Sequence, residues 1–141
     1  MNSFFFFFSI KQRQIFDQTA IAKGLPPQAV EKDLWVTVIL QLVFTLKDFD
    51  KLVFKGGTSL SKVWGLISRF SEDIDLAVDR SLFGQKGDLT VKQLKKLRKE
   101  SSMFVSGVFN KSLCVAINEN GLNKYLTVIP QPAGEGDKTY P

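Results

Sequence analysis

The feature that most constrains this chain is a short apolar run that ends in a pair of glycines. Residues 52–54 predict a buried strand, and Gly56-Gly57 follows after a single lysine. Glycine adopts backbone conformations that other residues avoid, and the next residues predict a short helix to about Ile67, capped by Thr58 or Ser59. A strand, a glycine turn and a helix are therefore expected in direct succession.

A glycine turn that opens a helix can bind phosphate. Glycines allow backbone amides to approach an anion closely, and the helix N-terminus adds a favourable dipole. Lys55 and Lys62 add positive charge, and Thr58 and Ser59 add hydroxyl groups. The turn is not a Walker loop, because the G-x-x-x-x-G-K-[ST] spacing is missing. A purely structural connector is the alternative interpretation.

Two aspartates lie at the start of a second predicted strand, which covers Ile74 to Val78. Asp73 and Asp75 are two residues apart, so on a strand they point to the same side. Two neighbouring carboxylates repel unless a cation lies between them, and Mg²⁺ binds through a few carboxylates plus substrate phosphates. The pair is therefore a candidate magnesium site, with a solvated strand edge as the alternative.

The amino-acid composition excludes several classes of catalytic and metal site. The 141 residues include no histidine and one cysteine, Cys114, which we expect to be buried in a helix. Ser-His-Asp and Cys-His catalysis, a zinc site of Cys and His, and an internal disulfide are all excluded. Any reaction must use carboxylates, hydroxyls, Lys, Arg, backbone amides or a metal held by oxygen.

A basic cluster is expected on a long helix that Thr90 caps, that runs from Val91 to about Asn118 and that Gly121 ends. The net charge of +5 and the pI near 9.4 favour polyanionic partners. The cluster could contact an RNA backbone, or it could be a solvated helix face. Its members are Lys92, Lys95, Lys96, Arg98 and Lys99.

The remaining segments predict two further helices and one further strand. The helices cover Ile10 to Lys23 and about Gln28 to Leu46, and the strand covers Tyr125 to Ile129. Strands and helices together indicate an α/β (α+β) fold with helices packed on a mixed sheet.

The first nine residues form a separate apolar segment that contains the five phenylalanines Phe4 to Phe8. The run is too short to span a membrane and lacks the features of a secretory signal. We therefore expect a cytoplasmic protein with no membrane association. A misplaced start codon or a cloning scar is the alternative origin of the run.

The order of these motifs resembles the DNA polymerase β nucleotidyltransferase superfamily: an apolar strand, Gly-Gly-[ST], a helix, and Asp-x-Asp on the next strand. More closely, the chain is similar to the AbiEii/AbiGii nucleotidyltransferase toxin family over most of residues 10–130. The resemblance implies a polymerase-β-like core, of which residues 10–141 are the N-terminal part. It rests on Val30-Glu-Lys-Asp-Leu-Trp-Val-Thr37, Phe54-Lys-Gly-Gly-Thr-Ser-Leu-Ser-Lys62 and Arg69-Phe-Ser-Glu-Asp-Ile-Asp-Leu76.

The resemblance also implies a role for each motif residue. Asp73 and Asp75 would be the catalytic carboxylates that bind Mg²⁺, as part of a two-metal site. The turn would hold the nucleoside triphosphate, with nearby cations beside its phosphates. The residues implied in nucleotide binding are Lys55, Gly56, Gly57, Thr58, Ser59, Lys62 and Arg69.

The function implied is a magnesium-dependent nucleotidyltransferase of a bacterial toxin–antitoxin or phage-abortive system. It would transfer a nucleotide from an NTP to an RNA, such as tRNA, or to a protein acceptor, and would have a cognate antitoxin. Family members are longer, and the superfamily's third carboxylate is expected beyond Pro141. We therefore expect the chain alone to bind nucleotide weakly and to transfer none. The alternatives are a truncated, catalytically silent remnant that binds nucleotide or RNA, and a basic module that binds RNA or antitoxin.

Overall fold

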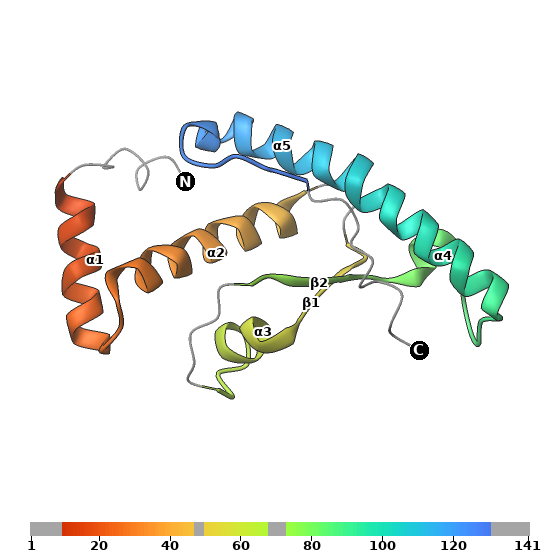
Figure 1. Cartoon of the computed structure of the whole chain (residues 1–141), viewed down its shortest axis with the longest axis horizontal. Coiled ribbons are helices and arrows are strands. Elements are labelled where there is room, and N and C mark those ends of the chain that lie inside the picture. Colours follow the sequence, from red (N-terminus) through yellow and green to blue (C-terminus); the bar gives the residue numbers. More distant parts are fainter. Residues whose placement is uncertain (1–9, 47–49, 68–72, 131–141) are drawn as a thin grey trace. The chain divides into compact units, whose positions relative to one another are not determined.

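The computed structural model describes residues 10–46, 50–67 and 73–130. The apolar segment 1–9 and Arg69 lie outside the described residues. The elements, labelled as in Figure 1, are α1 (Ile10–Lys23), α2 (Pro27–Thr45), β1 (Leu52–Lys55), α3 (Gly56–Lys62), β2 (Asp75–Val78), the 3-10 helix η2 (Arg80–Phe83), α4 (Val91–Met103), the π-helix η3 (Phe104–Phe109), α5 (Asn110–Glu119) and the 3-10 helix η4 (Leu122–Lys124).

The described chain forms two compact units. One comprises residues up to 41 together with 54–76, and the other comprises 42–53 together with the residues from 77 onward. Helix α2 and both strands pass from one unit into the other. The candidate motif residues from 54 to 76 all fall in the first unit, so the site can be described within one body.

The sheet confirms an α+β fold. In the described residues it has two strands, β1 and β2, which pair antiparallel in place of the mixed sheet expected. The backbone N–H of Asp79 donates to the carbonyl of Lys51 at 2.8 Å, just beyond both strands. Opposite residues in an antiparallel pair keep a constant sum of numbers, so Lys55 lies opposite Asp75.

The third strand predicted over 125–129 is wrong. This segment has no regular structure, and the N–H groups of Tyr125 and Leu126 both bond back to the carbonyl of Leu122 at 2.9 Å. An apolar run becomes a strand only where it pairs with a neighbouring strand, and the sequence pattern does not show whether one is present.

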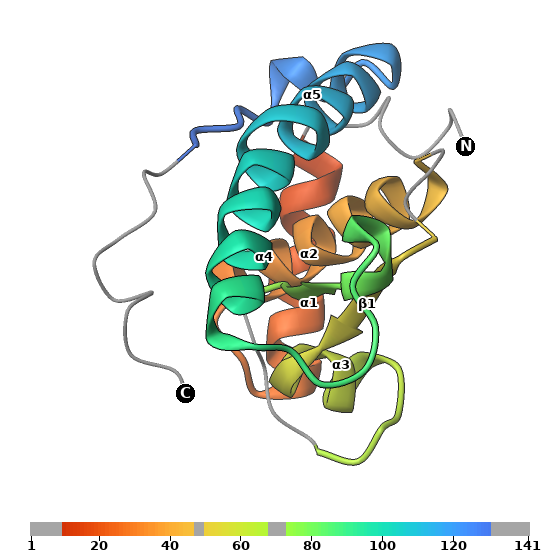
Figure 2. The ribbon, with the colours of Figure 1, turned by 90° about the vertical axis from the view of Figure 1, so that its right-hand side faces the viewer.

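The helices predicted for the first unit are all present, but some of them begin or end at other residues than predicted. Helix α1 has the predicted bounds, and α2 begins at Pro27, where a missing N–H costs little. Helix α3 begins at Gly56, directly after β1 (Figure 2). The predicted cap at Thr58 or Ser59 is therefore wrong, because both residues lie within the helix and are buried.

Helix α3 is also shorter than expected. It ends at Lys62 rather than near Ile67. Gly65 has a positive φ of 61°, and the N–H of Leu66 bonds back to the carbonyl of Leu60 at 2.9 Å. A left-handed glycine after the last turn is a common way to end a helix.

The long helix of the second unit is confirmed from Val91 onward, with a wider turn in its middle. Thr90 caps it through a capping box with Gln93. The run α4, η3 and α5 continues to Glu119, as Figure 1 shows, and Gly121 follows with a φ of 67°. Within the described residues, none of these helices is both long enough and apolar enough to cross a membrane.

The expected burial of Cys114 is wrong. It is exposed on α5, and its thiol donates to Oδ1 of Asn110 at 3.7 Å. Its apolar neighbours Ala116 and Ile117 are buried, two and three residues further along. Ala116, two residues after Cys114, projects from another side of the helix, so an apolar neighbour in sequence does not imply burial.

Candidate functional site

The Gly-Gly turn and the second strand meet at Gly56. This residue has a φ of 76°, a conformation that side chains rarely tolerate. A Cβ placed on it would also lie 2.8 Å from Cγ and 3.0 Å from Cβ of Asp75. Glycine is therefore required here twice, for the backbone conformation and for the close approach of the aspartate.

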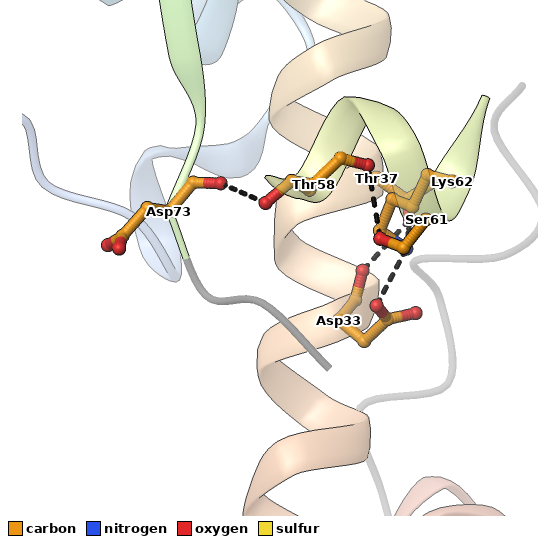
Figure 3. A network of polar contacts seen from close by, with 6 residues as sticks. All are labelled: Asp33, Thr37, Thr58, Ser61, Lys62 and Asp73. Carbon is orange, nitrogen blue, oxygen red and sulfur yellow. Dashed lines mark hydrogen bonds and ion pairs between the residues drawn. The ribbon is translucent and has the colours of Figure 1, made fainter. Parts of the chain in front are cut away.

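A second link joins the start of α3 to the segment before β2. Thr58 is 1% exposed, and its hydroxyl donates to the backbone carbonyl of Asp73 at 2.6 Å (Figure 3). The hydroxyl hydrogen is thereby used inside the protein. Thr58 positions the Asp-x-Asp segment against the turn, a role that the sequence pattern did not predict.

The two aspartates keep their side chains at the surface. Asp75 is the first residue of β2, and Asp73 lies two residues before it, outside the strand; both are exposed. In Figure 3 the carboxylate of Asp73 points away from Thr58, although its carbonyl is held by that residue. The two carboxylates are thus accessible to a ligand while their backbone is fixed to the turn.

The described residues bring no larger set of metal-ligating side chains together. Among them, no three Asp, Glu, Cys or His side chains form a group that could hold an ion. A cation bound by Asp73 and Asp75 would take its other ligands from elsewhere, such as phosphate oxygens or water, which is usual for Mg²⁺.

The remaining motif residues near the turn lie in different environments. Lys55 is the exposed last residue of β1 and lies opposite Asp75, so it adds positive charge beside that carboxylate. Gly57 is half-buried in the first turn of α3. Ser59 is 5% exposed, and its carbonyl accepts from the N–H groups of Val63 and Trp64.

The structure places Lys62 at the other end of α3, in contact with α2. Its Nζ lies 2.7 Å from Oδ1 of Asp33 and donates to Oγ1 of Thr37 at 3.1 Å (Figure 3). Asp33 and Thr37 are one helical turn apart, and the Thr37 hydroxyl also bonds to the Asp33 carbonyl at 2.9 Å. Asp33 and Thr37 are polar residues one turn apart in a largely apolar helix, and this spacing is the sequence feature that could have predicted the contact.

The structure therefore brings part of the predicted set together. Gly56, Thr58, Asp73 and Asp75 are in direct contact through the turn, and Lys55 lies opposite Asp75. Lys62 is held by α2 instead. Helix α3 is thus anchored at both ends, by Thr58 to the aspartate segment and by Lys62 to α2.

Most of the chain is similar to one known protein family. Residues 39–128 match the family model described as "Nucleotidyl transferase AbiEii toxin, Type IV TA system", a narrower range than residues 10–130. The match includes the glycine turn and both aspartates. Neither the curated proteins nor the solved structures gave a match. The matched residues make up more than half of the chain, and the chain therefore belongs to the AbiEii family of nucleotidyltransferase toxins of type IV toxin–antitoxin systems.

Proposed function

We propose that the turn at Gly56 and the Asp73–Asp75 segment bind a nucleoside triphosphate together with Mg²⁺, as the nucleotide site of a nucleotidyltransferase. Membership of the AbiEii family supports this assignment. The single observation that carries it is the 2.6 Å hydrogen bond from Thr58 to Asp73. This bond fixes the backbone of the two carboxylates to the turn that would hold phosphate.

The residues present fit magnesium. Asp73 and Asp75 provide exposed carboxylate oxygens, the ligand type that Mg²⁺ prefers. Because no third acidic side chain joins them in the described residues, phosphate oxygens would complete the coordination. When bound, Mg²⁺ would neutralise phosphate charge and polarise the group that is transferred.

The chain's own residues would bind and orient the triphosphate. The first N–H groups of α3, from Gly56 onward, have no partner within the helix, because the first four of any helix lack one. Glycines at 56 and 57 present no side chain to an approaching phosphate. Lys55 would add a cation on the same strand edge, whereas Lys62 would act through α2 and not through the nucleotide.

The partner is proposed from the family description, and the acceptor from the resemblance to nucleotidyltransferase toxins. We infer a cognate antitoxin, because the family belongs to type IV toxin–antitoxin systems. An RNA such as tRNA, or a protein, would receive the nucleotide, and the reaction would occur in the cytoplasm. These assignments rest on family membership and not on the site's geometry.

Calorimetric titration with a nucleoside triphosphate, with and without Mg²⁺, tests the site. The wild-type chain should bind more tightly with the metal present. Asp73→Asn and Asp75→Asn should each remove this metal-dependent gain in affinity. Asp88→Asn changes an exposed loop residue and should leave the gain unchanged. Equal affinities in all four proteins would show that the aspartates do not hold the metal.

A transfer assay separates an enzyme from a silent remnant. The chain is incubated with each labelled nucleoside triphosphate, Mg²⁺ and total tRNA, and the label is followed into RNA and protein. Transfer that is lost in Asp75→Asn would establish the reaction and its acceptor. Metal-dependent binding without transfer would identify the binding-only alternative.

A further inference from the structure

Helix α4 carries four lysines on one face. Lys92, Lys95, Lys96 and Lys99 follow the spacing i, i+3, i+4 and i+7, which places them on one side of an α-helix. All four are exposed. We call this set the lysine stripe; it extends over about 10 Å, at 1.5 Å per residue.

The opposite face of the helix packs inside the second unit. Leu97, Ser101 and Phe104 are half-buried along this face. The ring of Phe104 packs edge-on against Phe83 of η2, with 5.9 Å between the centroids. The stripe therefore faces away from the packed side of its own unit.

The charge of the stripe is little compensated. Glu100 is the acidic residue of α4, and it approaches Lys96 at 3.7 Å across one turn. Among the described residues of this unit, ten Lys and Arg stand against five Asp and Glu, compared with six against five in the first unit. The excess positive charge of the described chain is thus concentrated in the unit that carries the stripe.

We infer that the lysine stripe is a docking surface for the phosphate backbone of a nucleic acid. Protein–protein interfaces are depleted in lysine and have apolar or aromatic centres, and no apolar residue lies among these four. Lysines that neutralise phosphates are the main source of sequence-independent affinity for nucleic acids. The inference concerns a surface other than the nucleotide site and does not depend on the proposed function.

Fluorescence anisotropy with a short single-stranded RNA and the same sequence as DNA tests the stripe. The full chain is titrated between about 50 and 200 mM salt, and log K is plotted against log[salt]. The variant with Lys92, Lys95, Lys96 and Lys99 changed to Gln should lose up to about 3 units of this slope, since each single-strand phosphate contact contributes roughly 0.7. Gln is a good helix former, so α4 should persist.

A second variant controls for net charge. Lys11, Arg13 and Lys23 of α1 and Lys111 of α5 are exposed, and changing these four to Gln removes the same charge. This control, and a variant with Arg at the four stripe positions, should keep the wild-type slope. Loss of slope for both RNA and DNA identifies backbone contact, and loss for RNA alone identifies backbone contact that also requires the 2′-hydroxyl.

Two results would overturn the inference: an equal loss of slope in the two Gln variants, or no nucleic-acid binding by the wild-type chain. Affinity for the nucleoside triphosphate with Mg²⁺ is measured on the same proteins. The stripe variant should keep that affinity. A chain that binds nucleic acid through the stripe but binds no nucleotide would refute the proposed function alone.

Discussion

Alanine substitution at Gly56 tests the close approach of Asp75 to the turn. Alanine at Gly65 is the control for backbone strain alone. Gly56 and Gly65 both have positive φ, 76° and 61°, so alanine at either site should cost about 1 kcal/mol of stability. A Cβ at 56 would also meet Asp75, whereas nothing lies within 4 Å of one at 65. Gly56→Ala should therefore destabilise more than Gly65→Ala in urea unfolding, and it alone should weaken nucleotide binding.

Equal losses of stability in these two variants would contradict the close approach of Asp75 to the turn. Unchanged nucleotide affinity in Gly56→Ala would show that the phosphate site lies elsewhere.

Thr58 joins the turn to the aspartate segment through one buried hydrogen bond. Thr58→Val keeps the shape but removes the donor to the Asp73 carbonyl, at a cost of about 1 kcal/mol in the free energy of unfolding. Thr58→Ser should restore most of that energy. Because Asp73 would lose its backbone anchor, metal-dependent nucleotide affinity should fall in Thr58→Val and recover in Thr58→Ser.

Ser61→Ala is the matched control, since it removes a hydroxyl bond of 3.2 Å to the Thr58 carbonyl within the same helix. A loss of nucleotide affinity as large in Ser61→Ala as in Thr58→Val would mean that general weakening of α3 is responsible, and not the bond to Asp73.

At the scale of elements, the contact between α2 and α3 depends on Lys62 and Asp33. The pair is partly exposed, with side chains 22% and 45% accessible, so solvent screens it. A double-mutant cycle with Lys62→Met and Asp33→Asn should give a coupling energy below about 1 kcal/mol in unfolding. The same variants should change nucleotide affinity far less than Gly56→Ala does. A large loss of affinity in Lys62→Met alone would restore its expected role beside phosphate.

The start of η2 should be sensitive to acid. The backbone N–H of Ser81 donates to Asp79 at 2.7 Å, and this bond, then the Ser81 side chain, then Lys51 and Arg80, hold the pKa of Asp79 below its ordinary value. A lowered folded pKa means that the carboxylate stabilises the protein above its unfolded pKa. That stability is lost as the pH falls through the folded pKa.

The difference in unfolding temperature between the wild type and Asp79→Asn should therefore be full at neutral pH and should close as the pH falls below about 4. A difference that stays constant from neutral pH to pH 3 would show that the charge of Asp79 does not stabilise η2.

Across the whole chain, the sequence predicted local elements better than their partners. Helix α1, Thr90 as a cap and Gly121 as a stop follow from local chemistry, and the structure confirms them. The strand at 125–129 failed because pairing is a non-local property. Helix α3 began early for a similar reason, since the Thr58 hydroxyl bonds to a residue 15 positions away instead of capping its own helix.

The candidate site was predictable in composition but not in geometry. The turn and the aspartates were identified from their types and spacing, and the family match includes them. The spacing could not show that Asp75 lies against Gly56 or that Thr58 holds Asp73. Lys62 was assigned to phosphate by its position after the turn, whereas its side chain reaches Asp33 on a helix 29 residues earlier in the chain.

Metal and nucleotide are proposed to meet at Asp73 and Asp75. Electron paramagnetic resonance with Mn²⁺ in place of Mg²⁺ measures this, because binding removes the free-ion signal and a titration without protein subtracts the Mn²⁺ held by the nucleotide alone. Mn²⁺ should bind the protein weakly without nucleotide, since two carboxylates alone supply few ligands, and much more strongly with a nucleoside triphosphate. Asp73→Asn and Asp75→Asn should abolish the increase, and Asp88→Asn should keep it. An increase of wild-type size in either site variant would show that the metal and the nucleotide do not meet at these aspartates.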